Sequence, residues 1–398
     1  MIPLAFSPFR ARSPQPVGLV LTGGGARAAY QVGALVGIRR VLLESGWPSD
    51  ANPFRVFCGT SAGAINATVL ASAADEFFDA VARLALVWGS LEPAQVYRVD
   101  TGGALGNAAQ WLGGAGLGWL VRRQPRAFFD TEPLNDLLIR MIDFERLGRN
   151  LQGGRFDALA VAASSYTSGQ HVTFFQSRDA RDAITRSQRL AYPAVLTVDH
   201  LMASSAIPFL FPAIPLTMEG RNEYFGDGSM RQTAPISPAI HLGARKIMVI
   251  GSAELDRNAA NRDENGSQYT YPSLAQVGAH ALASIFLDAL ASDLERLERI
   301  NRTVAELSPK ALARTKLRPL KTLVISPSRP LDRVAQPHVK RLPRSVRTLL
   351  RVMGATRGRG AGLSSYLLFD RSYTRRLLAM GRRDALAKRA EIEAFFRN

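Results

Sequence analysis

The stretch from Phe54 to Leu70 reads F-R-V-F-C-G-T-S-A-G-A-I-N-A-T-V-L, and the predicted fold follows from it. It opens on a short apolar run with strand composition, and its second half reads as a buried helix. Ser61 lies between them, with Gly59 and Gly63 two residues to either side. This spacing predicts a nucleophile elbow, because the glycines allow a turn too tight for side chains. The alternative is a glycine-lined turn in which the serine caps a helix.

Length and composition indicate a folded protein with more than one part. The chain has 398 residues, of which 46% are hydrophobic and 21% charged. It therefore exceeds the usual size of a single core, about 250–300 residues. The one cysteine, Cys58, excludes an internal disulfide and a cysteine-rich zinc cluster. Since it lies on the strand before Ser61, we expect it to pack in the core.

The N-terminal part begins with a strand, a glycine turn and a helix. Residues 17–22 form an apolar run that leads directly into Gly23, Gly24 and Gly25, and apolar positions from 31 to 42 predict a helix. This unit predicts an α/β fold with a largely parallel sheet. Further strands are predicted at residues 156–163, 171–175, 246–251 and 320–325.

The glycine turn has two interpretations. Gly23, Gly25 and Ala28 match the dinucleotide-binding pattern G-x-G-x-x-A, with Glu44 near the position of a ribose-binding acid. That interpretation requires the acid at the end of a second strand, whereas Glu44 follows the first helix. The alternative is an oxyanion hole, in which backbone N–H groups face the oxygen that becomes negative during acyl transfer.

Arg27 lies directly beyond this turn. Its guanidinium could hold the loop open through hydrogen bonds to carbonyl groups, or place positive charge near a phosphate. The alternative is a solvated arginine in the first turn of the helix.

Five motifs occur in the order in which they are found in one family. The chain resembles the patatin-like phospholipase family over roughly residues 16–252. The motifs are G-G-G-A-R-A-A-Y-Q-V-G-A-L at Gly23–Leu35, G-T-S-A-G-A-I-N-A at Gly59–Ala67, F-D-T-E-P-L at Phe129–Leu134, A-S-S-A-I-P-F-L-F-P at Ala203–Pro212 and D-G-S at Asp227–Ser229.

The resemblance implies a three-layer α/β/α fold with a mostly parallel central sheet, and a catalytic pair of serine and aspartate without histidine. Carried over by motif, Ser61 is the nucleophile and Asp227 the base. The oxyanion and substrate-binding region then comprises Gly24, Gly25, Arg27 and Ala62. The chain departs from the family pattern at Ser229, where D-G-G is usual.

The function implied is a serine-dependent lipid acyl hydrolase of the phospholipase A, lysophospholipase or esterase type, acting on a lipid or ester substrate without metal or organic cofactor. The alternative is a non-catalytic lipid-binding or scaffold protein that retains the fold. None of the five histidines lies in a motif typical of the base of an esterase triad. A carboxylate is a weaker base than imidazole by about two pKa units, so Asp227 should lie in a desolvated pocket within roughly 3 Å of the Ser61 hydroxyl.

Residues 101–121 contain seven glycines and two tryptophans but no charged residue. This composition argues against a stable helix. A mobile lid that touches lipid is one interpretation, and an ordinary packed loop is the other.

The last part of the chain is strongly basic. Residues 310–360 carry fourteen lysines and arginines against one acidic residue, Asp332, within a chain of net charge +17. The charge favours peripheral contact with an anionic membrane, with a solvated surface as alternative; nucleic acid is unlikely because aromatic interleaving is missing. We expect a catalytic domain at residues 1–300 and a basic, mainly helical C-terminal extension at 301–398 that adds a strand and helices to the core. The sequence shows no secretory signal or membrane span, so we expect a cytoplasmic protein, in peripheral contact with membrane if the basic segment binds lipid.

Overall fold

The computed structural model describes residues 15–98, 127–179, 182–186, 188–253, 289–315, 317–352 and 361–397. The segment at 101–121, for which we considered a lid, lies outside the described residues. The strands are β1 Val17–Leu21, β2 Val56–Thr60, β3 Ala158–Ser165, β4 His171–Ser177, β5 Ile184–Arg186, β6 Arg189–Pro193, β7 Ile214–Met218, β8 Arg221–Asp227, β9 Lys246–Ile250 and β10 Lys321–Ile325. The α-helices are α1 Ala29–Glu44, α2 Ala62–Ser72, α3 Phe77–Ser90, α5 Glu132–Met141, α6 Phe144–Gln152, α7 Val198–Ser204, α8 Ser237–His241, α10 Ala289–Glu306, α11 Pro309–Ala313, α12 Leu331–Ala335, α13 Arg344–Val352, α14 Ala361–Leu367, α15 Arg371–Ala387 and α16 Arg389–Arg397.

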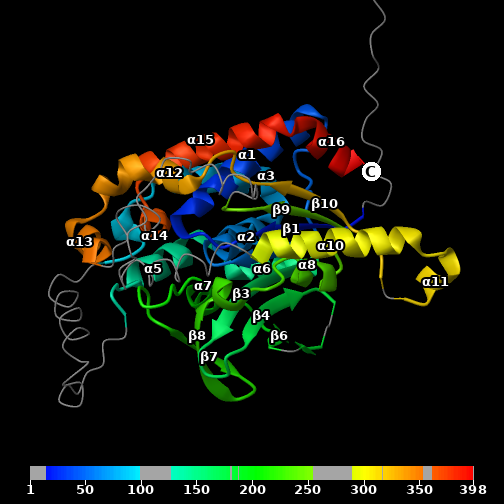
Figure 1. The fold of residues 1–398 in the computed structure, drawn as a ribbon, viewed down its shortest axis with the longest axis horizontal. Coiled ribbons are helices and arrows are strands. Elements are labelled where there is room, and N and C mark those ends of the chain that lie inside the picture. Colours follow the sequence, from blue (N-terminus) through cyan, green and yellow to red (C-terminus); the bar gives the residue numbers. More distant parts are fainter. Residues whose placement is uncertain are drawn as a thin grey trace, which may run out of the picture.

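The described strands form one sheet with the order β10-β9-β1-β2-β3-β4-β6-β5, and β7 and β8 form a hairpin that pairs with β3 through β8. From β10 to β3 every neighbouring pair is parallel. The hairpin of β7 and β8 projects at the bottom of Figure 1. The mostly parallel sheet expected from the sequence is therefore confirmed.

Alternate residues along the central strands face two separate apolar clusters. Leu19 and Phe57 belong to a cluster that includes residues of α1, α2, α3 and α15, whereas Val20 and Cys58 belong to one that includes residues of α8 and α10. Because both faces of a parallel sheet are covered, its strands are apolar throughout. Figure 1 shows α1, α3 and α15 along one side of the sheet. The predicted three-layer α/β/α fold is confirmed, and Cys58 is a buried core residue as expected.

The predicted strands at residues 17–22, 156–163, 171–175, 246–251 and 320–325 are present as β1, β3, β4, β9 and β10, with small changes at their ends. Helix α1 ends at Glu44, whose carboxylate accepts hydrogen bonds from Arg40 and Arg389. Glu44 therefore does not follow a second strand, and the dinucleotide interpretation is wrong.

The C-terminal part packs on the core through several elements. Strand β10 continues the sheet beside β9, and α15 packs along α1. The two helices are so close that a side-chain carbon at Gly381 would lie 2.1 Å from the backbone oxygen of Tyr30. The boundary predicted at residue 300 stays a prediction. In the described part of the chain, every helix is too short or too polar to cross a bilayer.

Candidate active site

Ser61 occupies the sharp turn between β2 and α2. Its backbone has φ 54° and ψ −133°, a conformation that residues with a side chain rarely adopt. The turn is tight because α2 runs directly past β1: a side-chain carbon at Gly63 would lie 2.3 Å from the backbone oxygen of Leu21. The local geometry is that of the elbow which the glycine spacing predicts.

The strained turn is held by a serine from another helix. The Ser61 backbone N–H donates to the Ser204 hydroxyl over 2.8 Å, and that hydroxyl donates to the carbonyl of Ala162 over 2.6 Å. Ser204 is buried at the end of α7. Sequence reasoning did not single it out, although it lies in the quoted motif at residues 203–212. The motif thus connects α7 to the elbow.

Strand pairing brings Asp227 to the same place. Thr60, the last residue of β2, pairs with Ala162 of β3, and Asp227, the last residue of β8, pairs with the next residue, Ala163. Since β4 occupies the other edge of β3, β2 and β8 lie end to end along one edge. Ser61, the residue that follows β2, and Asp227, the last residue of β8, therefore lie at the same point along β3.

The carboxylate of Asp227 is fully buried. Its Oδ1 accepts a hydrogen bond of 2.9 Å from the Ser229 backbone N–H, whereas Oδ2 makes no hydrogen bond of ordinary geometry within the described residues. Burial raises the pKa of Asp227 to about 6, against the opposing effects of the Ser61 hydroxyl and of Ser229. The register of β2 and β8 along β3 brings the Ser61 turn to this carboxylate. A buried acceptor with a raised pKa has the properties of a general base.

The turn from Gly23 to Ala28, here named the glycine loop, faces this pair. A side-chain carbon at Gly23 would lie 3.4 Å from Cβ of Ser61 and 2.3 Å from the Ser229 hydroxyl. Ala62 begins α2, where first-turn N–H groups have no acceptor within the helix. The glycine loop and the start of α2 therefore both lie beside Ser61.

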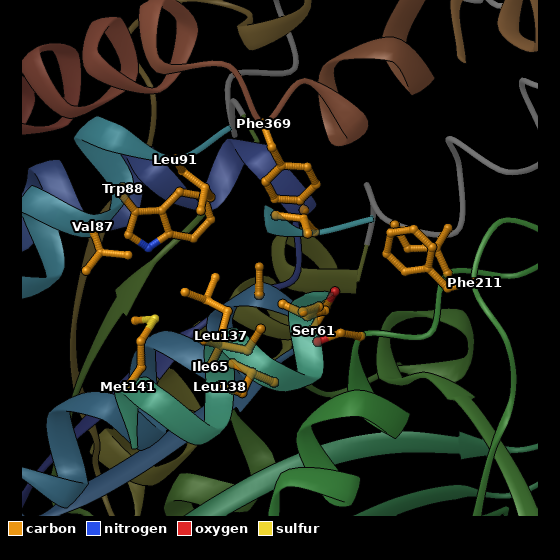
Figure 2. Close-up of a pocket in the computed structure, with 16 residues that line it drawn as sticks. Ser61, Ile65, Val87, Trp88, Leu91, Leu137, Leu138, Met141, Phe211 and Phe369 are labelled. Carbon is orange, nitrogen blue, oxygen red and sulfur yellow. The ribbon is translucent and has the colours of Figure 1, made fainter. Parts of the chain in front are cut away.

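A cavity of about 50 Å³ opens from Ser61 and is almost entirely apolar. Figure 2 shows Ser61 between side chains of α3 and α5 on one side and the ring of Phe211 on the other, with Phe369 nearby. The lining comprises Gly25, Ser61, Ala62, Ile65, Val87, Trp88, Leu91, Val96, Leu134, Leu137, Leu138, Met141, Ser205, Ile207, Phe211 and Phe369. Such a lining suits a hydrocarbon chain. Gly25, Ser61 and Ala62 were predicted site residues, whereas the side chains from α3 and Phe369 lie outside the quoted motifs.

The structure places the Arg27 side chain inside the protein. The side chain is 3% exposed, so it is not a solvated arginine. It contacts Asp332, Ser365 and Tyr366 in the C-terminal part. In the sequence, Asp332 could have been noticed as the one acidic residue among the fourteen basic residues of 310–360.

The described histidines do not form a triad with Ser61. His171 is buried, and burial, followed by the charge of Arg189, lowers its pKa to about 4. The ring nitrogens of His200 and His338 contact Thr197 and Ser372. His241 lies on α8, and His280 is outside the described residues. Among the described residues, no group of three or more histidine, cysteine, aspartate or glutamate side chains could hold a metal ion.

Residues 19–240 match the model of the family described as "Patatin-like phospholipase". No curated protein matches the sequence. Solved structures that resemble the chain include VipD from Legionella pneumophila, with 15% identity and a TM-score of 0.30 over 79% of this chain and 62% of that one. Human GIVD cytosolic phospholipase A2 has 13% identity and a TM-score of 0.47, over 96% of this chain and 60% of that one. ExoU of the ExoU-SpcU complex of Pseudomonas aeruginosa has 16% identity and a TM-score of 0.27, over 88% of this chain and 68% of that one. The chain thus spans about three fifths of the length of the first two.

Proposed function

The chain belongs to the patatin-like phospholipase family, and on that premise we propose that it is a serine-dependent lipid acyl hydrolase that uses Ser61 and Asp227. The observation that carries the proposal is the meeting of β2 and β8 on one edge of β3, which joins a strained serine to a buried carboxylate. The apolar cavity that opens from Ser61 supports an acyl chain as the group held during reaction.

The reaction follows from this arrangement. The Ser61 hydroxyl attacks the ester carbonyl while Asp227 accepts its proton, and the alcohol leaves with that proton. Water then attacks the acyl-serine, Asp227 accepts a proton from the water, and Ser61 regains one as the acid leaves. The N–H groups of Gly24, Gly25 and Ala62 stabilise the negative oxygen in both steps.

A membrane surface is the proposed source of the substrate. Lys340, Arg341 and Arg344 are exposed on and beside α13, which lies at the left end of the molecule in Figure 1. Clustered basic residues attract anionic lipid by about 1 kcal/mol each near the surface. The basic segment would therefore act on encounter with lipid and not on bond cleavage.

Covalent labelling tests the catalytic proposal. A fluorophosphonate should label the parent stoichiometrically at Ser61 and leave Ser61→Ala unlabelled, while Ser90→Ala, an exposed serine on α3, should label like the parent. Ser61→Ala and Asp227→Asn should each remove nearly all hydrolysis of a short soluble ester, and the double variant should lose no more, because the two residues act as one unit. A folded parent that is unlabelled but binds fatty acid would establish the non-catalytic alternative instead.

A further inference from the structure

The glycine loop is held by residues that follow it by more than 300 positions. Arg27 donates from Nε to the Ser365 hydroxyl over 2.6 Å and from Nη1 to the Tyr366 hydroxyl over 3.3 Å. Its Nη2 forms an ion pair with the carboxylate of Asp332 on α12. All three partners lie outside residues 19–240, the part that matches the family.

The backbone of α14 contacts the loop as well. Gly25 has φ +53°, and a side-chain carbon there would lie 2.4 Å from the backbone oxygen of Tyr366. The guanidinium of Arg27 lies 4.0 Å from the centre of the Tyr366 ring. Gly25 also lines the cavity beside Ser61, so α14 packs against the outer side of a residue whose inner side faces the reaction.

A second anchor holds the start of the loop. Ser252, after β9, donates a hydrogen bond to the Gly23 carbonyl, and its backbone N–H donates to the Thr22 hydroxyl over 3.1 Å. The Arg27 backbone N–H donates to the Gly24 carbonyl over 3.0 Å. The loop is therefore fixed at its start by Ser252, and at Arg27 by α12 and α14.

The charge of Arg27 requires a partner at this depth. A buried cation that loses its carboxylate is destabilised or moves toward another acceptor. Asp332 itself is 45% exposed at its side chain, so its replacement leaves the core packing intact. A shift of Arg27 would move Gly24 and Gly25, since both precede it directly in the same short loop.

We propose that Asp332 is a positioning residue, which holds Arg27 and through it keeps the N–H groups of Gly24 and Gly25 directed at the oxyanion. This inference rests on the proposed function for its catalytic consequence, whereas its structural part concerns the loop alone. The C-terminal part then contributes to the site by supplying these three partners of Arg27 from outside residues 19–240.

The test compares Asp332→Asn with Asp332→Glu and with a control, Glu391→Gln. The control breaks the exposed ion pair between Glu391 on α16 and Lys388, the residue before that helix. Asp332→Asn should lower kcat for a short soluble ester by between about 10-fold and about 100-fold with KM little changed, because a displaced donor acts mainly on the transition state. The rate of labelling by fluorophosphonate should fall in proportion, since its phosphoryl oxygen takes the oxyanion position. Asp332→Glu should restore most of the rate, and Glu391→Gln should behave as the parent.

Amide hydrogen exchange of residues 23–28 separates this inference from the proposed function. Exchange should become faster in Asp332→Asn and not in Glu391→Gln, with melting temperatures recorded for both. Unchanged exchange and unchanged kcat in Asp332→Asn would overturn the inference, as would equal losses in both variants. If the parent neither hydrolyses ester nor reacts with fluorophosphonate, the proposed function fails, and amide exchange alone decides whether Asp332 holds the loop.

Discussion

Replacement of Asp227 by asparagine should make the protein inactive and more stable at neutral pH. Burial raises the pKa of Asp227 from 3.8 to about 6, so the folded state holds its proton more tightly than the unfolded chain does. At about 1.4 kcal/mol per pKa unit, the buried charge costs about 3 kcal/mol of unfolding free energy once it is fully ionised. Asparagine avoids this cost and can still accept from the Ser229 N–H through its oxygen.

The sign of the pH dependence follows from the raised pKa in the folded state. Below the unfolded value near 3.8 the carboxyl group is neutral in both states and costs nothing. The parent then loses stability as pH rises toward and through about 6, and above that pH the full cost applies. The advantage of Asp227→Asn should therefore be about 3 kcal/mol at pH 7.5 and close to zero at about pH 3.5.

The assay is urea unfolding of parent and variant at several pH values, with ester hydrolysis measured on the same preparations. Asp136→Asn on α5 is the control, because that carboxylate is exposed and its replacement should change stability by less than about 0.5 kcal/mol at any pH. A variant no more stable than the parent at pH 7.5, or a gain that is the same at pH 4, would refute the reasoning.

Three further predictions concern other parts of the molecule. The kcat/KM for a short soluble ester should fall about tenfold per pH unit below about pH 6, since Asp227 must be ionised to act as the base; a profile flat to pH 4.5 would argue against it. Neutralising three exposed basic residues near α13 should weaken binding to anionic vesicles by at most about 3 kcal/mol while soluble-ester hydrolysis is unchanged, and a control set from another surface should bind as the parent does. The test set is Lys340, Arg341 and Arg344, and the control set is Arg245, Arg299 and Arg302. Gly381→Ala should lower the melting temperature despite the better helix propensity of alanine, because the new carbon would lie 2.1 Å from the Tyr30 backbone oxygen. The control is Gly148→Ala on α6, where the new carbon meets nothing within 4 Å and should raise stability by about 1 kcal/mol.

The C-terminal part of the chain combines a strong positive charge with contacts to the site. Its charge was its most visible property in the sequence, and the proposed encounter with lipid rests on that charge. Through its contacts with the glycine loop and with α1, it also helps to position the residues of the site. The vesicle-binding variants and the Asp332 variants separate these two roles, because they change different residues and are read by different assays.

Local backbone geometry could be predicted because it is encoded by neighbouring residues. The spacing of Gly59, Ser61 and Gly63 predicted the elbow, since a turn this tight depends only on which adjacent positions carry side chains. The buried strands were visible for a similar reason: a strand covered on both faces is apolar at every position. The strands β5 to β8 were missed because their residues show no continuous apolar run, and β6 to β8 are only partly buried.

Tertiary structure alone decided which distant residues meet at the site. Nothing in the local sequence shows that Asp227 enters the edge of β3 where β2 ends; that follows from the register of two strand pairs. The lining of the cavity comes from α2, α3, α5 and loops that no periodicity relates to one another. Arg27 and Asp332 are 305 residues apart in the sequence. They form an ion pair because α12 and α14 pack against the glycine loop. A pattern in sequence reports short-range backbone preference and burial, whereas the pairing of side chains across the fold depends on where whole elements pack.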